Sequence, residues 1–158
     1  MMPRRKFCIK RGQYKPGLQP DLAVATMWGM VAINLVRGAD YSTGENPGGS
    51  LTLVERALPI EVWGWIFLTA AVVMGYGLWT RRFRPVIFSS VTSMSAYITL
   101  AVGAVVNAME TLMRFGWPPD RFRDVGVYAF FALLSGCYAY GAVLKQAAVR
   151  SESSLKEG

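Results

Sequence analysis

Few residues of this chain are of the types, or at the spacings, that catalysis or metal binding needs. Histidine is absent from the 158 residues, which removes the commonest general base and the commonest metal ligand. The two cysteines, Cys8 and Cys137, lie far apart in the sequence and do not indicate a disulfide framework. Ser135 has no base near it in sequence, and Gly48-Gly49 lacks the Lys-Ser/Thr pair that would follow in a phosphate loop. We therefore predict no catalytic residue, no metal site, no cofactor and no enzymatic activity.

The densest group of polar side chains lies in an apolar run over residues 85–108. Ser89 and Ser93 are four residues apart, which puts both side chains on one face of a helix. This face could line a hydrated path, or it could pack closely against another helix, since small residues let backbones approach and hydroxyls bond across. Because we expect no charged residue in the interiors of the apolar runs, we favour packing. Asn34 and Asn107 are expected near the ends of their runs, where they would hydrogen-bond at the interface.

Small residues also recur at a spacing of four. Ala104 and Ala108 form one such pair, and Ala132 and Gly136 form another. Small-xxx-small pairs bring helices close together in membranes. We predict that these residues, together with the two serines of the hydroxyl face, form helix-packing or association surfaces, and that the chain is a homo-oligomer.

Long apolar runs must position these side chains. Hydrophobic residues make up 53% of the chain, and they gather into runs of the length that a membrane helix needs. We predict an all-α fold, a four-helix transmembrane bundle. The expected segments are a basic cytoplasmic tail over 1–19, a membrane domain over 20–147 with spans at about 20–38, 62–80, 85–108 and 125–144, and a polar cytoplasmic tail over 148–158. The last residues, SESSLKEG, are expected to be disordered.

The first span is the shortest, because its apolar core covers only residues 22–36. A cleaved signal peptide is the competing interpretation: a basic start, a short apolar core and then Gly38-Ala39. The basic segment is long for a signal peptide and no clean A-x-A site follows it. We favour a retained helix.

Aromatic and basic residues mark the expected ends of the spans. Tryptophan gathers at membrane–water interfaces, and Lys and Arg gather on the cytoplasmic side. The connection between the second and third spans is very short, which predicts an antiparallel hairpin. The predicted interface anchors are Trp63 and Trp65 at one end of the second span, and Trp79, Arg81, Arg82 and Arg84 at the other.

The basic balance fits a membrane orientation. The net charge is +7, and most of the Lys and Arg residues fall in segments that this topology puts in the cytoplasm, with Arg37 in an external connection. The positive-inside rule then predicts that both termini are cytoplasmic. We expect the lipid bilayer as the partner and no nucleic acid, because the basic residues flank apolar runs and form no stripe on a foldable domain.

The longest connection covers residues 38–61. Its first half is rich in turn formers. Thr52 and Glu55 fit a capping box for a short helix that could lie on the bilayer surface. An ordinary loop turn is the alternative. This loop is also where a protein partner would dock.

Two segments near this loop carry a resemblance to a known group. RGADYSTG (37–44) and LVERALPIEVWGW (53–65) are similar to segments of small multi-span membrane proteins of phages of actinobacteria, several of which are described as holins. The resemblance implies a protein that accumulates in the inner (cytoplasmic) membrane, associates through helix faces and then permeabilises or depolarises the membrane. Two alternatives stay open: a membrane-resident binding or superinfection-exclusion protein, and a small channel or transporter subunit.

Overall fold

All regular structure in the described part of the chain is α-helical. The computed structural model describes residues 20–43, 58–116 and 119–157. Its helices are α1 (Pro20–Ser42), α3 (Ile60–Trp79), α4 (Phe83–Phe115) and α5 (Pro119–Glu157). Each contains a stretch long and apolar enough to cross a membrane: Leu22–Ser42, Ile60–Trp79, Phe83–Arg114 and Phe122–Ala147. These helices confirm the predicted all-α class and indicate a multi-pass membrane protein.

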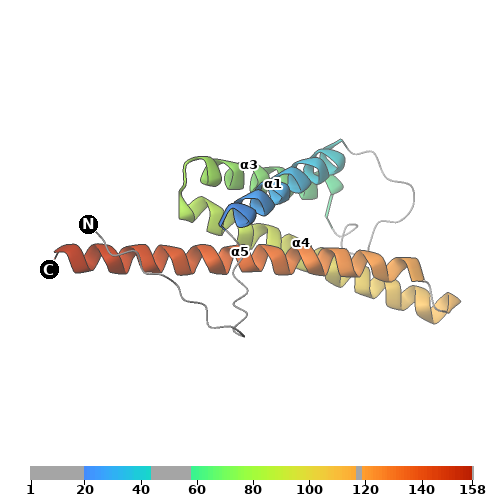
Figure 1. The fold of residues 1–158 in the computed structure, drawn as a ribbon. Coiled ribbons are helices and arrows are strands. Elements are labelled where there is room, and N and C mark those ends of the chain that lie inside the picture. The colour runs from blue at the N-terminus through green and yellow to red at the C-terminus, as the bar shows by residue number, and fades with distance from the viewer. Residues whose placement is uncertain (1–19, 44–57, 117–118, 158) are drawn as a thin grey trace, which may run out of the picture.

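The helices pack as two pairs (Figure 1). The long helices α4 and α5 lie side by side, α1 lies against α3, and α3 joins the pairs through its contact with α4. Large apolar side chains fill the space between them, as close packing in a protein interior requires. The largest fully buried side chains of this core are Met30, Phe67, Met74, Tyr97 and Leu100.

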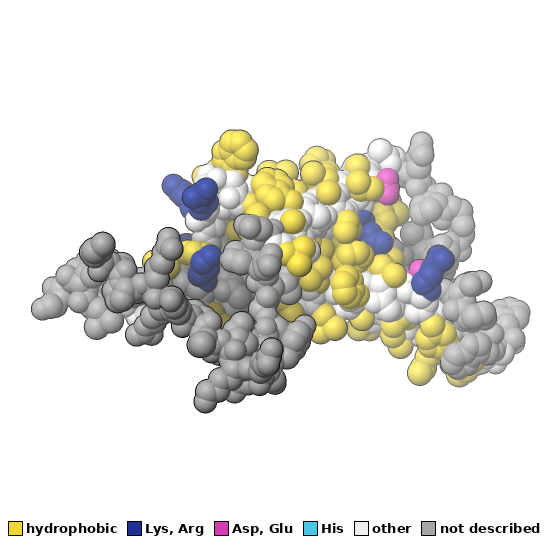
Figure 2. Space-filling model, viewed as in Figure 1, with side chains coloured by type: hydrophobic (Ala, Val, Ile, Leu, Met, Phe, Trp, Pro, Cys, Tyr) yellow, Lys and Arg dark blue, Asp and Glu magenta, His cyan; other side chains and the backbone are white. Residues whose placement is uncertain are grey.

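Much of the outer surface is hydrophobic. Figure 2 shows one face on which apolar side chains cover the middle, while basic side chains stand at its two ends and also among the apolar ones. Among the most exposed large hydrophobic side chains are Trp79, Met113 and Leu133. An apolar surface of this extent is unusual for a soluble monomer, and it suits helices surrounded by lipid.

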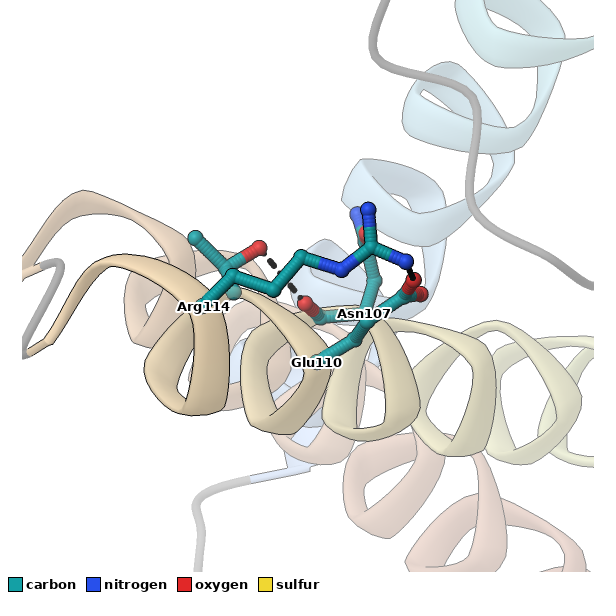
Figure 3. A network of polar contacts seen from close by, with 4 residues as sticks. Asn107, Glu110 and Arg114 are labelled. Carbon is teal, nitrogen blue, oxygen red and sulfur yellow. Dashed lines mark hydrogen bonds and ion pairs between the residues drawn. The ribbon is translucent and has the colours of Figure 1, made fainter.

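The helices extend beyond the spans expected from hydropathy. Helix α1 continues to Ser42, past the expected end at residue 38, and α4 continues to Phe115 because the polar residues after the apolar run still support helix. Arg114 forms an ion pair with Glu110, four residues earlier, at 2.6 Å. Figure 3 shows this pair beside Asn107, whose carbonyl oxygen accepts the Thr111 hydroxyl at 2.8 Å. The charged residues Glu110 and Arg114 therefore follow the apolar run without ending the helix α4.

The carboxyl-terminal segment corrects a second expectation. The last residues were expected to be disordered, but α5 runs through Glu157. No proline or glycine interrupts the sequence between Gly141 and Gly158, so nothing local breaks the helix. The interfacial helix expected around Thr52 lies outside the described residues.

The turn between α3 and α4 forms the predicted hairpin and ends α3 in a Schellman motif. The Arg82 N–H donates to the Gly77 carbonyl at 3.0 Å, and the Arg81 N–H donates to the Leu78 carbonyl at 3.3 Å. The motif needs a left-handed residue after the helix, and Arg81 supplies it with φ 54°. A non-glycine residue in this conformation is strained.

Replacing Arg81 with glycine should therefore stabilise the turn. We expect Arg81→Gly to raise the free energy of unfolding by about 1 kcal/mol, because glycine adopts positive φ without steric cost. Thermal or denaturant unfolding in detergent micelles would measure the change. Arg82→Gly is the matched control, since it removes the same charge at a residue with φ −96°. Equal gains in both variants would show that charge, and not backbone strain, matters here.

Candidate functional site

A network of buried polar side chains joins α1 to α4. Asn34 is fully buried, and its Nδ2 donates to Ser93 Oγ at 3.0 Å. The Tyr97 hydroxyl donates to Asn34 Oδ1 at 2.8 Å. Asn34 thus uses both ends of its amide on neighbouring turns of α4. In a bilayer such bonds hold helices together, because no water competes for the donors.

The guanidinium of Arg37 lies one turn of α1 beyond this network. Its Cζ atom is 4.8 Å from the ring centroid of Tyr128, 5.6 Å from that of Tyr97 and 6.0 Å from that of Phe67. These rings belong to α5, α4 and α3, so Arg37 brings side chains of all four described helices together. Cation–π attraction of this kind strengthens when the charge is removed from water. The Nη1 atom of Arg37 is buried and has no hydrogen-bond acceptor among the described residues.

This arginine corrects the expected distribution of charge. From the sequence we expected Arg37 in an external connection and every charge at the end of a span or in a connection. The structure places it inside α1, within the candidate span Leu22–Ser42. The apolar run stops at Val36, which hides the continuation of the helix. One signal was available: Arg37 follows Asn34 by three residues and therefore shares its face of a helix.

The hydroxyl face predicted on the third span lies inside the bundle. Ser89 and Ser93 are both buried. Ser93 bonds across to α1, whereas Ser89 donates to the Val86 carbonyl of its own helix at 3.1 Å. The hydroxyls of Ser90 and Ser135 are buried without a hydrogen-bond partner among the described residues. That this face serves helix packing and does not line a hydrated path stays a prediction.

The predicted small-residue pairs also lie largely within the fold. Ala104, Ala108 and Ala132 are buried by other parts of the same chain. Gly136 is half-buried, and a Cβ atom there would lie 3.1 Å from Met94 Sδ on α4. Their role in association between chains stays a prediction.

The predicted interface anchors differ in their surroundings. Trp65 and Trp79 are 64% and 83% exposed, and the three arginines of the turn are exposed as well. Trp63 is only 4% exposed and belongs to the core. It lies one turn from Phe67 on the same face of α3, so it faces the other helices. Anchoring by the exposed residues stays a prediction.

An open apolar groove of about 780 Å³ runs between α4 and α5. Cys137 lies in this groove, is exposed and is free. The groove is separate from the Asn34 network, because none of the residues of that network lines it. Apolar side chains line it, including Ile98, Val102, Ala129, Leu133, Gly136 and Cys137.

Other kinds of site have less support. Among the described residues, no group of His, Cys, Asp or Glu side chains could hold a metal ion. No protein-family model, curated protein or solved structure matches this chain. The features that bear on function are therefore the groove, the buried polar network and the distribution of charge.

Proposed function

We propose that this chain is a phage holin-like integral membrane protein. It would assemble in the inner (cytoplasmic) membrane, with both termini in the cytoplasm, and permeabilise or depolarise that membrane. The observation that carries the proposal is the open apolar groove on the paired helices α4 and α5. The positive-inside rule supports the orientation, because exposed Arg81, Arg82 and Arg84 gather at the α3–α4 turn.

The groove suits a helix of a second copy. Lipid is as apolar as a leucine side chain, so association between membrane helices depends on shape and close packing. Small residues such as Ala129 and Gly136 leave room in the groove, while Leu133 is 71% exposed and stands out from α5. A ridge of bulky side chains from a second copy would make more dispersion contacts there than mobile lipid tails.

Cysteine crosslinking tests this association. In a Cys8→Ser background Cys137 is the only cysteine, and oxidation in membranes should give disulfide-linked dimers if two grooves face each other. Ala129→Phe should fill the groove and reduce the dimer by at least about fivefold, which corresponds to about 1 kcal/mol of lost association. This change is cleaner than Gly136→Ile, because a Cβ at Gly136 already crowds Met94.

Two controls complete the test. A Val72→Cys variant in a cysteine-free background presents a thiol on the exposed surface of α3, and it should crosslink much less. Inducible expression with a potential-sensitive dye measures the activity: the parent chain should collapse the membrane potential, and Ala129→Phe should delay the collapse. Normal potential at high expression of the parent chain would refute the holin-like function.

A channel or transporter subunit is the second candidate. The buried network around Asn34 and the charge of Arg37 favour it, since ionisable residues inside a membrane commonly mark a transport path. The binding or superinfection-exclusion alternative depends on the loop over residues 38–61, most of which lies outside the described residues.

A further inference from the structure

Two groups that can only donate hydrogen bonds are buried near one end of the bundle. Nη1 of Arg37 and Nε1 of Trp63 are both buried without an acceptor among the described residues. A guanidinium and an indole have no acceptor atom of their own. A buried donor that has lost water and found no partner costs roughly 1–3 kcal/mol, and more when it is charged.

Both groups lie near the end of the bundle where α1 ends and α3 begins. Arg37 precedes Ser42, the last residue of α1, by five residues, which is about 8 Å along the helix axis. Trp63 follows Ile60, the first residue of α3, by three residues, which is about 5 Å. The last turn of α1 lies against the first turns of α3, because a Cβ atom at Gly64 would lie 2.6 Å from the Ser42 nitrogen. The hydrocarbon core is about 30 Å thick, so both donors lie within reach of the headgroup layer.

The charge of Arg37 is uncompensated in the described chain. Its guanidinium has three aromatic rings as neighbours and no ion pair among the described residues. The acids nearest to it in sequence and along the adjoining helix, Asp40 and Glu61, are exposed and do not pair with it. A charge at this depth is expensive unless an opposite charge accompanies it.

The chemistry of these groups selects the class of ligand. A cation would meet a fixed positive charge and two groups without lone pairs, so it is excluded. An oxyanion offers several acceptor oxygens, and its geometry matches the planar N–H fork of a guanidinium. We propose that Arg37, with Trp63 as a second donor nearer the end of the bundle, forms a binding site for a phosphate group. The phosphate would come from an anionic lipid headgroup or from free phosphate in solution.

The site can be tested by ligand-dependent stability of the purified chain in detergent micelles. Thermal unfolding would be followed against sodium phosphate, with sodium chloride holding the ionic strength constant, and separately against phosphatidylglycerol or phosphatidylcholine added to the micelles. A ligand that binds only the folded state raises the midpoint in a saturable way. We expect phosphatidylglycerol or inorganic phosphate to do so, the first identifying a lipid headgroup as the source and the second a soluble anion.

Variants locate the effect. Arg37→Gln should weaken the apparent affinity at least tenfold, and Trp63→Phe should weaken it several-fold. Arg37→Lys keeps the charge but loses the fork, so it should also bind more weakly and it remains informative if the glutamine variant does not fold. Arg114→Gln is the control, because Arg114 is exposed and already paired with Glu110. The proposal is overturned if neither phosphate source shifts the midpoint, if chloride gives the same shift, or if Arg37→Gln and Arg37→Lys both respond like the parent chain. None of these measurements depends on the proposed permeabilising activity.

Discussion

Gly64→Ala is expected to lower the free energy of unfolding by about 2–3 kcal/mol, the upper part of the range for overpacked sites. The Cβ atom of an alanine would lie 2.6 Å from the Ser42 nitrogen and 3.0 Å from the Gly38 carbonyl oxygen. Both neighbours are backbone atoms of α1 and cannot rotate away, as a side chain would. The helices α1 and α3 would have to separate, and the contact that holds α1 in the bundle would weaken.

The measurement is equilibrium unfolding in detergent, with other glycines of the same helices as controls. Gly38→Ala should behave like Gly64→Ala, since its Cβ would lie 2.7 Å from Leu68 Cγ and 2.9 Å from the Leu68 nitrogen. Gly29 lies on α1 like Gly38, but a Cβ atom at Gly29 would meet nothing within 4 Å. Gly29→Ala should be neutral or stabilising by up to about 1 kcal/mol, the difference in helix propensity. If Gly64→Ala matched Gly29→Ala, the close approach of α1 and α3 would be wrong.

The part of the fold that sequence alone could predict is the part set by local composition. Apolar runs of membrane length identify α3, α4 and α5, and the short basic connection after Trp79 identifies the hairpin. Helix α1 was harder to predict, because its apolar core is short and is followed at once by the charge of Arg37. What decides its length is packing: once α1 lies against α3, its last turns continue to Ser42 although they are polar. Hydropathy measures the transfer of side chains to lipid and contains no information about the contact between α1 and α3.

The polar site depends on contacts between residues far apart in sequence. The bond between Asn34 and Ser93 joins positions 59 residues apart, and no local pattern predicts such a pairing. The same holds for Trp63. The preference of tryptophan for membrane interfaces predicts that this side chain lies at the interface, but the packing of the helices turns it toward the core. Periodicity gave the faces that carry these residues, but which face meets which is settled only by the three-dimensional arrangement.

Asn34→Leu is the second change expected to have a large effect, a loss of about 2 kcal/mol in the free energy of unfolding. Leucine has the same number of side-chain heavy atoms and branches at the same carbon, so the loss comes mainly from hydrogen bonding. The substitution leaves the hydroxyls of Ser93 and Tyr97 buried without the partner that each has in the native bundle. Orphaned polar groups of this kind cost roughly 1–3 kcal/mol. Asn107→Leu is the control, because Asn107 takes part in its hydrogen bond with Thr111 through the backbone carbonyl and not through its side chain.

A double-mutant cycle with Tyr97→Phe separates the hydrogen bond from packing. Removing the tyrosine hydroxyl alone leaves Asn34 Oδ1 without its donor, whereas removing it from the Asn34→Leu variant removes an orphan. The two changes should therefore be less costly together than the sum of the single changes, by about 1 kcal/mol, within the range measured for hydrogen bonds between membrane helices. Additive losses would mean that the bond contributes nothing and that α1 is held to α4 by apolar contacts alone. A positive coupling would instead make this network the polar contact that places Arg37 over the rings of Tyr97 and Tyr128, because a shift of α1 at Asn34 would move Arg37 with it.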